Sequence, residues 1–160
     1  ETGNASFTGF GVKKILQPTK SLPDYNTVSD ADVVIMRYAH VLLMIAEAEN
    51  EVNGPTEKAL KAINAVRTRS HQPAIDGTGL TQAELRERIR NEWRVETCFE
   101  GLRYFQLKRW KQLQQVVDGA VDPAYPSYIK VVKPAFEFFP LPQGEIDKAH
   151  GVLVQDPNYQ

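Results

Sequence analysis

Ionisable side chains recur at helical spacing along residues 84–100. Every fourth position carries a member of the mostly acidic set Glu84, Arg88, Glu92, Glu96 and Glu100, and the same interval separates Arg86, Arg90 and Arg94. Because side chains four apart share one helix face, the first set forms an acidic ridge and the arginines lie on roughly the opposite side. Charges at this spacing are suited to ion pairing. For Arg86 and Arg90 we expect ordinary solvated pairs.

The end of this charged stretch is crowded by apolar residues. Glu96, Glu100, Arg103 and Arg109 are interspersed there with Phe99, Leu102, Phe105, Leu107 and Trp110. Buried charges require partners, so we predict a structural ion network. We expect Arg67 or Arg69 to pair with Glu96 or Glu100 across the helices. Removing one partner of such a pair costs about 3–5 kcal/mol.

The residue pattern does not indicate a catalytic site. Glu92 and Glu96 lie four apart, but helix carboxylates at that spacing are usually solvated or ion-paired, and a glycosidase needs two carboxylates facing across a cleft. Cys98 is the single cysteine, and its helical context predicts a small buried core residue. The three histidines show no zinc-ligand spacing. We expect no catalysis, no metal and no other cofactor.

Aromatic residues in turn-rich segments offer a different chemistry. A flat ring stacks on the apolar face of a sugar while neighbouring polar groups bond its hydroxyls, a use of amphipathic rings. Tyr25, Tyr125 and Tyr128 lie in such segments. They are our candidate ligand-binding residues, although each is also compatible with a packing role.

The first two predicted helices form a hairpin. Residues 33–52 are apolar almost all round, which predicts an enclosed helix, and Gly54 suits its end. Pro55 stands at the favoured first position of a helix that runs to Ser70. The unit from residue 37 to 70 is alanine-rich and about 34 residues long, which is typical of tetratricopeptide-like helix pairs.

The next helix begins with a capping box, Thr81 and Glu84. Gly101 interrupts it, and helical patterning resumes through Gln115. Residues 1–30 are irregular, residues 31–117 carry the helical hairpins, and residues 118–160 form a Pro-rich tail. In the tail we expect order from aromatic burial, with short extended segments at 128–132 and 136–139. The fold class is therefore mainly α with a mostly irregular tail.

Bulk composition narrows the function classes. The chain has 160 residues and a net charge of −1, with 19 basic and 20 acidic residues. Such a balance lacks the excess positive charge that is typical of proteins that bind nucleic acid. The chain starts without Met, and we expect it to be part of a longer protein.

Several segments, taken in order, resemble the C-terminal part of the SusD/RagB family. They are residues 37–48 (RYAHVLLMIAEA), 63–69 (INAVRTR), 96–103 (ETCFEGLR), 107–110 (LKRW), 140–146 (PLPQGEI) and 155–159 (QDPNY). The resemblance covers residues 7–160. It implies a mainly helical, tetratricopeptide-like scaffold that is not an enzyme. Family residues carried onto this scaffold are Glu47, Asn64, Arg67, Glu96, Glu100, Arg103, Arg109 and Trp110.

The resemblance also implies a function. Members of this family are lipid-anchored at the surface of the outer membrane in Bacteroidetes, bind glycans or other nutrients, and deliver them to a TonB-dependent transporter of the SusC type. This chain would be a single C-terminal region, residues 1–160, whose parent chain supplies the lipid anchor. Two alternatives stay open: a helical-repeat adaptor that binds a protein or peptide, and a small hydrolase.

Three positions and the ending at residues 147–150, which lacks the usual Asn-Pro run, depart from the family pattern. His40 stands where a glutamate is usual, Trp93 where an arginine is usual, and Gln106 where an aspartate is usual. The missing acidic residues are expected to rearrange part of the ion network. Trp93 is expected to fill space as an apolar group.

Overall fold

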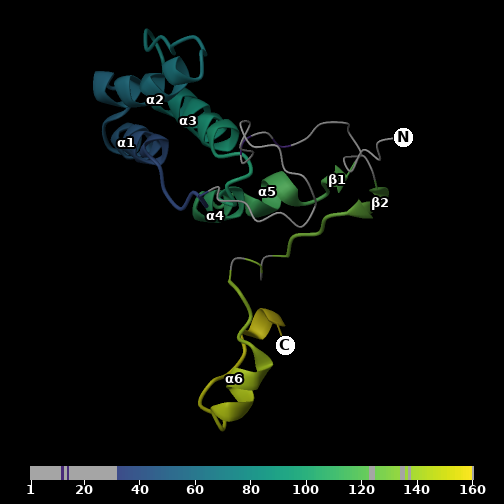
Figure 1. Cartoon of the computed structure of the whole chain (residues 1–160). Coiled ribbons are helices and arrows are strands. Elements are labelled where there is room, and N and C mark those ends of the chain that lie inside the picture. The colour runs from purple at the N-terminus through teal and green to yellow at the C-terminus, as the bar shows by residue number, and fades with distance from the viewer. Residues whose placement is uncertain are drawn as a thin grey trace. The chain divides into compact units, whose positions relative to one another are not determined.

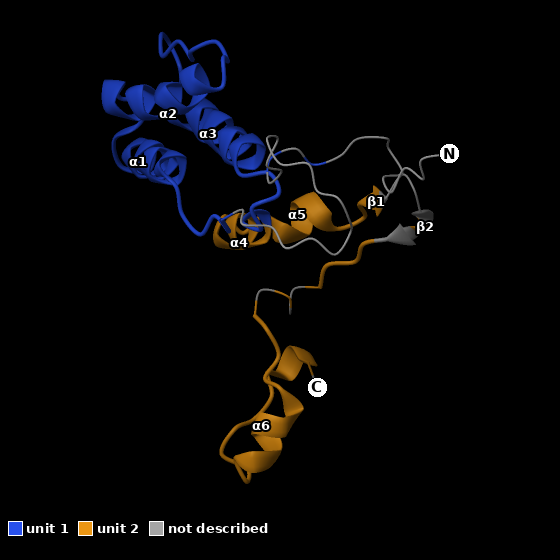
Figure 2. Cartoon of the chain, viewed as in Figure 1, with its two compact units in different colours: residues 1–103 blue, residues 104–160 orange. Residues whose placement is uncertain are grey.

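In the computed structural model the chain is mainly helical, as the sequence predicts. The structure describes residues 12, 14, 32–122, 125–133, 136 and 138–159. The chain divides into two compact units, residues 1–103 and residues 104–160, which are described separately below (Figure 2).

Three helices build the first unit: α1 (Tyr38–Asn53), α2 (Glu57–Arg69) and α3 (Gln82–Glu96). Helix α1 packs against both α2 and α3 (Figure 1). The fully enclosed apolar side chains come from all three: Leu43, Ala46, Ala59, Ile63, Val66, Leu85 and Ile89. The alanines let the helix backbones approach closely, and each buried Leu or Ile contributes about 1.5–3 kcal/mol. The predicted helical hairpin of residues 37–70 is confirmed.

Helix α1 begins five residues later than the predicted residue 33. Arg37 has extended backbone angles, φ −139° and ψ 164°, and its side chain is bound to Glu96 and Glu100. These bonds and the extended backbone mark the point where the helix begins. Val33 and Ile35 lie before α1 and are each 88% exposed, so the expectation that residues 33–52 are enclosed on all sides is wrong for this segment.

The turn between α1 and α2 also differs from the prediction in one detail. Gly54 has a positive φ of 80° and donates its N–H to Asn50 O at 2.9 Å, so its lack of a side chain suits the end of α1. Helix α2 is capped by Thr56, whose hydroxyl accepts the N–H of Ala59. Pro55 therefore precedes the cap and does not occupy the first helical position.

Helix α3 starts as predicted. The Thr81 hydroxyl accepts the Glu84 N–H, and the Glu84 carboxylate accepts the Thr81 N–H at 2.9 Å, which completes the capping box. Gln82 then ties α3 to the end of α1, because its amide donates to Asn50 O at 2.7 Å. The helix ends at Glu96, and Gly101, with φ of 76°, lies in the turn that follows.

The second unit contains short elements: helix α4 (Arg103–Arg109), which begins at the unit boundary, α5 (Leu113–Val117), β1 (Val121–Asp122), β2 (Tyr125–Ile129), α6 (Gln143–Lys148) and the 3₁₀ turn η2 (Pro157–Tyr159). Strands β1 and β2 pair antiparallel, with Val121 opposite Ile129 and an irregular register before Asp122. Strand β2 overlaps the extended segment expected at 128–132.

Two tail predictions need correction. The described residues among 136–139 lie in no strand, and α6 was not expected. Gln143 and Asp147 are hydrogen-bonded across one turn of α6 at 2.8 Å, and Pro142 directly precedes its first turn. Burial of Phe138 and Phe139 does not contribute to this order, since they are 66% and 69% exposed. Specific bonds hold the chain instead: the Tyr159 hydroxyl donates to Phe138 O at 2.7 Å, and the Gln155 amide donates to Leu141 O at 2.9 Å.

Candidate functional site

A cluster of ion pairs closes the end of the first unit where α1 starts and α3 stops. The Arg37 guanidinium lies between two carboxylates: it donates to Glu100 Oε1 through Nε at 3.0 Å and is also bonded to the Glu96 carboxylate. Its Nη2 reaches the Glu96 backbone oxygen at 2.6 Å. Arg37 therefore joins the segment before α1 to the last turn of α3 and the turn beyond it.

Glu100 collects two further donors. His40 Nε2 lies 2.6 Å from Glu100 Oε2, and Lys14 Nζ lies 2.5 Å from Oε1. Burial alone would raise the pKa of the Glu100 carboxyl, but hydrogen bonds from Arg37, Lys14 and His40 outweigh it and lower the pKa to about 2. His40 thus bonds to Glu100 from the first turn of α1.

The prediction that Arg67 or Arg69 pairs with Glu96 or Glu100 is confirmed by Arg69. Arg69 pairs with Glu96. Arg67 pairs with Glu92, at 2.6 Å from Nη1 to Oε2. Glu92 lies one helical turn before Glu96, level with Arg67, and its side chain is only 6% exposed. Its place on the acidic ridge was the available sequence signal.

Surface pairs follow the prediction for the opposite arginines. Arg86 binds Glu51 through Nε at 2.5 Å, and Arg90 binds Glu87 at 2.9 Å.

Cys98 is exposed and is not the buried core residue expected, because α3 has already ended at Glu96. Trp93 is buried as expected, at 5% exposure, with its ring centroid 6.0 Å from that of His40.

The chemistry of the ion-pair cluster favours a structural role. A general acid in a hydrolase needs a raised pKa near the working pH, whereas the pKa of Glu100 is lowered. Glu92 and Glu96 are each held by an arginine. Among the described residues, no group of three acidic, His or Cys side chains is placed to hold a metal ion.

The three tyrosines predicted to bind sugar stay a prediction. Tyr25 lies outside the described residues, and Tyr125 and Tyr128 belong to β2, where the structure describes their backbone alone. An aromatic group that the sequence analysis did not single out surrounds Lys108 in the second unit. Lys108 Nζ lies 5.2 Å from the Tyr104 ring centroid and 4.8 Å from that of Phe139.

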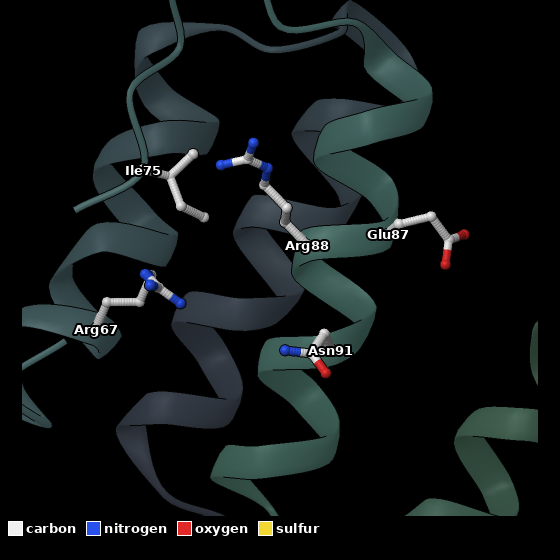
Figure 3. Close-up of a pocket in the computed structure, with 5 residues that line it drawn as sticks. All are labelled: Arg67, Ile75, Glu87, Arg88 and Asn91. Atoms are coloured by element: carbon white, nitrogen blue, oxygen red, sulfur yellow. The ribbon is translucent and has the colours of Figure 1, made fainter. Parts of the chain in front are cut away.

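A pocket of about 320 Å³ opens between α2, α3 and the loop that joins them. Figure 3 shows Arg88 and Asn91 extending from α3 toward the side occupied by Arg67 and Ile75, while Glu87 points away. Arg88 and Asn91 are three residues apart and so share one helix face. Sequence reasoning missed this site, because the charged ridge was interpreted only as a source of ion pairs.

The loop wall of the pocket is fixed by side chains of α2. Asn64 donates to Ile75 O at 3.0 Å and accepts the Ile75 N–H at 2.7 Å. Arg67 Nε donates to Pro73 O at 2.9 Å. Further along the loop, Gly77 lies so close to α2 that an added Cβ would come within 2.2 Å of Leu60 Cδ1. The pocket is therefore held in shape by specific contacts.

The model of the SusD family matches residues 1–159. The chain belongs to the SusD family. The resemblance inferred from the sequence segments is confirmed.

Curated and solved relatives agree with this assignment. SusD-like protein P2 of Formosa agariphila is 31% identical over 143 residues, which is 82% of this chain and 26% of that protein. The crystal structure of a SusD-like protein from Bacteroides fragilis has a TM-score of 0.69 and 29% identity, and the match covers 81% of this chain and 26% of that one.

A further similar structure is surface glycan-binding protein A from Bacteroides thetaiotaomicron, solved in complex with laminarihexaose. It has a TM-score of 0.63 and 29% sequence identity, and the match covers 78% of this SusD-family chain and 25% of the glycan-binding protein. The chain thus spans about a quarter of the length of these relatives. Within the described part of the chain, no helix combines the length and apolarity needed to cross a membrane.

Proposed function

We propose that this SusD-family protein holds a glycan or other nutrient at the outer-membrane surface and delivers it to a TonB-dependent transporter of the SusC type, without transforming it. The observation that carries the proposal is the family match over residues 1–159, together with similarity to a surface glycan-binding protein solved with laminarihexaose. The lowered pKa of Glu100 supports binding over acid–base catalysis.

The region described here would serve mainly as the scaffold of a longer protein. It spans about a quarter of the relatives it matches, and we place it in their C-terminal part, with the lipid anchor supplied by the remainder of the parent chain. The buried ion pairs of Arg37, Glu96 and Glu100 support this role, since they join segments distant in the sequence.

Tyr25, Tyr125 and Tyr128 remain proposed ligand contacts. Their support is chemical: tyrosine rings combine an apolar face with a hydroxyl, which suits sugars. Simultaneous substitution of all three by alanine is expected to weaken glycan binding while leaving helix content, measured by circular dichroism, unchanged. Unaltered affinity in that variant would remove these residues from the site.

A cellular experiment tests capture and delivery together. The gene is deleted in its source bacterium, growth is measured on a panel of single glycans, and an affinity-tagged copy of the full protein is isolated from outer membranes. We expect growth to be impaired on one glycan class and a TonB-dependent transporter to co-purify. Normal growth on every nutrient, with only a soluble protein or peptide partner recovered, would contradict the proposal and favour the adaptor alternative.

A further inference from the structure

We propose that the pocket between α2, α3 and the 72–79 loop binds the carboxylate-bearing ring of an acidic glycan, a uronic acid unit. This inference rests on the proposed function, because it assigns a substrate class to a glycan-holding protein. The pocket combines an unpaired positive charge, polar and apolar groups around that charge, and walls held by hydrogen bonds.

The charge available to a ligand comes from Arg88. Arg67, the other arginine of the pocket, is already neutralised by Glu92 at 2.6 Å. Across the described part of the chain, by contrast, no side chain or backbone oxygen accepts a hydrogen bond from Arg88. A guanidinium presents a planar fork of donors that matches a carboxylate with two parallel bonds.

The neighbouring carboxylates of Glu84 and Glu87 do not form an ion pair with the Arg88 guanidinium. Glu84 lies four residues before Arg88 and attracts it electrostatically, but its Oε2 is held by the Thr81 hydroxyl at 2.7 Å and by the Thr81 N–H at 2.9 Å, and the described side chains of Glu84 and Arg88 form no direct ion pair. Glu87 binds Arg90 at 2.9 Å and points away from the pocket (Figure 3). One positive charge is therefore left facing the cavity.

The remaining lining suits a sugar ring better than a bare anion. The Asn91 amide, one turn along α3 from Arg88, supplies both a donor and an acceptor for hydroxyl groups. Ile75, which is mostly buried at 7% exposure, supplies a small apolar part of the wall against which C–H groups of the ring can pack. A simple anion would use Arg88 and leave both of these unused. The cavity of about 320 Å³ lies at the small end of the range for ligand sites, which fits one sugar unit.

The rigidity of the lining supports specific recognition. The two hydrogen bonds between Asn64 and Ile75 hold the loop wall against α2, and Arg67 is fixed by Pro73 and Glu92. A site whose walls are fixed before binding loses less conformational freedom when the ligand enters.

The experiment is a calorimetric titration of the full protein. The probes are oligomers of galacturonic, glucuronic and mannuronic acid, with laminarihexaose as the neutral glycan and acetate as the simple anion. Arg88→Gln removes the charge at nearly constant shape, and Asn91→Ala removes the amide. The matched control is Arg94→Gln, an exposed arginine on the same helix that does not line the pocket. Circular dichroism verifies that each variant is folded.

We expect at least one oligouronate to bind more tightly than laminarihexaose and acetate. Arg88→Gln should weaken that binding about tenfold or more, the loss of a charged hydrogen bond, and Asn91→Ala should weaken it several-fold, while Arg94→Gln leaves it unchanged. Binding of laminarihexaose without any oligouronate would overturn this inference and leave the proposed function standing. Equal losses in Arg88→Gln and Arg94→Gln, or binding of acetate as tight as the oligouronates, would also overturn it. Failure of every probe to bind would overturn this inference, and the growth and co-purification experiment would decide the proposed function separately.

Discussion

At the scale of single residues, Glu100 is the point on which the charges of the first unit converge. Its carboxylate contacts Arg37, His40 and Lys14, and its side chain is only 6% exposed. One acidic group therefore joins the segment before α1, the first turn of α1 and Lys14, which lies 86 positions before Glu100 in the sequence.

Replacing the Glu100 carboxylate by an amide tests how much this group contributes to the free energy of unfolding. Glu100→Gln leaves Arg37 and His40 without their anionic partner, and we expect the free energy of unfolding to fall by roughly 2–3 kcal/mol. The loss is smaller than that for a fully buried pair, because Arg37 and Lys14 are 25% and 36% exposed. Denaturant titration measures the change. Glu57→Gln, at an exposed position of α2, is the matched control, and equal stability of the two variants would contradict the account.

The same carboxylate predicts how stability depends on pH. The folded pKa of Glu100 is lowered to about 2, below the value of about 4.3 for an unfolded glutamate. Its contribution is therefore complete above about pH 5 and is lost as the pH falls through the window toward 2, by up to about 3 kcal/mol. Unfolding free energies of the wild type and Glu100→Gln, measured from pH 6 to pH 2.5, are expected to converge at the acidic end. A constant difference between them would show that Glu100 does not titrate as argued.

At the scale of elements, the 72–79 loop depends on one asparagine of α2. Asn64→Ala removes both bonds to Ile75, and we expect the Ile75 amide to lose most of its protection from hydrogen exchange while the core amides of α1 keep theirs. Asn64→Asp, which retains an acceptor for the Ile75 N–H, should keep part of that protection. Unchanged exchange at Ile75 in Asn64→Ala would mean that other contacts hold the loop.

Local sequence signals predicted the elements, and tertiary contacts decided their limits. The Thr81–Glu84 capping box and the position of Gly54 are local devices, and both appear as expected. The start of α1 is not local, because Arg37 is bonded to residues about 60 positions away. Helix α6 was missed because the prolines around it predict irregular chain and its helical segment is short.

In the candidate site, too, the sequence predicted local features, whereas tertiary contacts determined which residues meet. The acidic ridge of α3 predicted where carboxylates would lie, yet it did not say that Arg67 would choose Glu92 over Glu96. The pocket needed the loop to be placed over α2, which depends on the Asn64–Ile75 bonds. No periodicity within α3 reveals that Arg88 and Asn91 face an apolar residue from another segment.

At the scale of the whole molecule, the chain is a SusD-family region that spans about a quarter of its relatives. Its described part consists of a helical unit closed by buried ion pairs and a second unit of short elements. In these ion pairs, arginine partners lower the pKa of the Glu100 and Glu51 carboxyls. We propose that the whole protein holds a nutrient without converting it.

The most direct measurement of this claim is a titration of the full protein with a panel of polysaccharides and their oligosaccharides, followed by chromatography of the same samples after prolonged incubation. We predict saturable binding to one glycan class, with the oligosaccharides recovered at their original length. Recovery of shortened or otherwise altered sugars, or the absence of binding to any member of the panel, would contradict it.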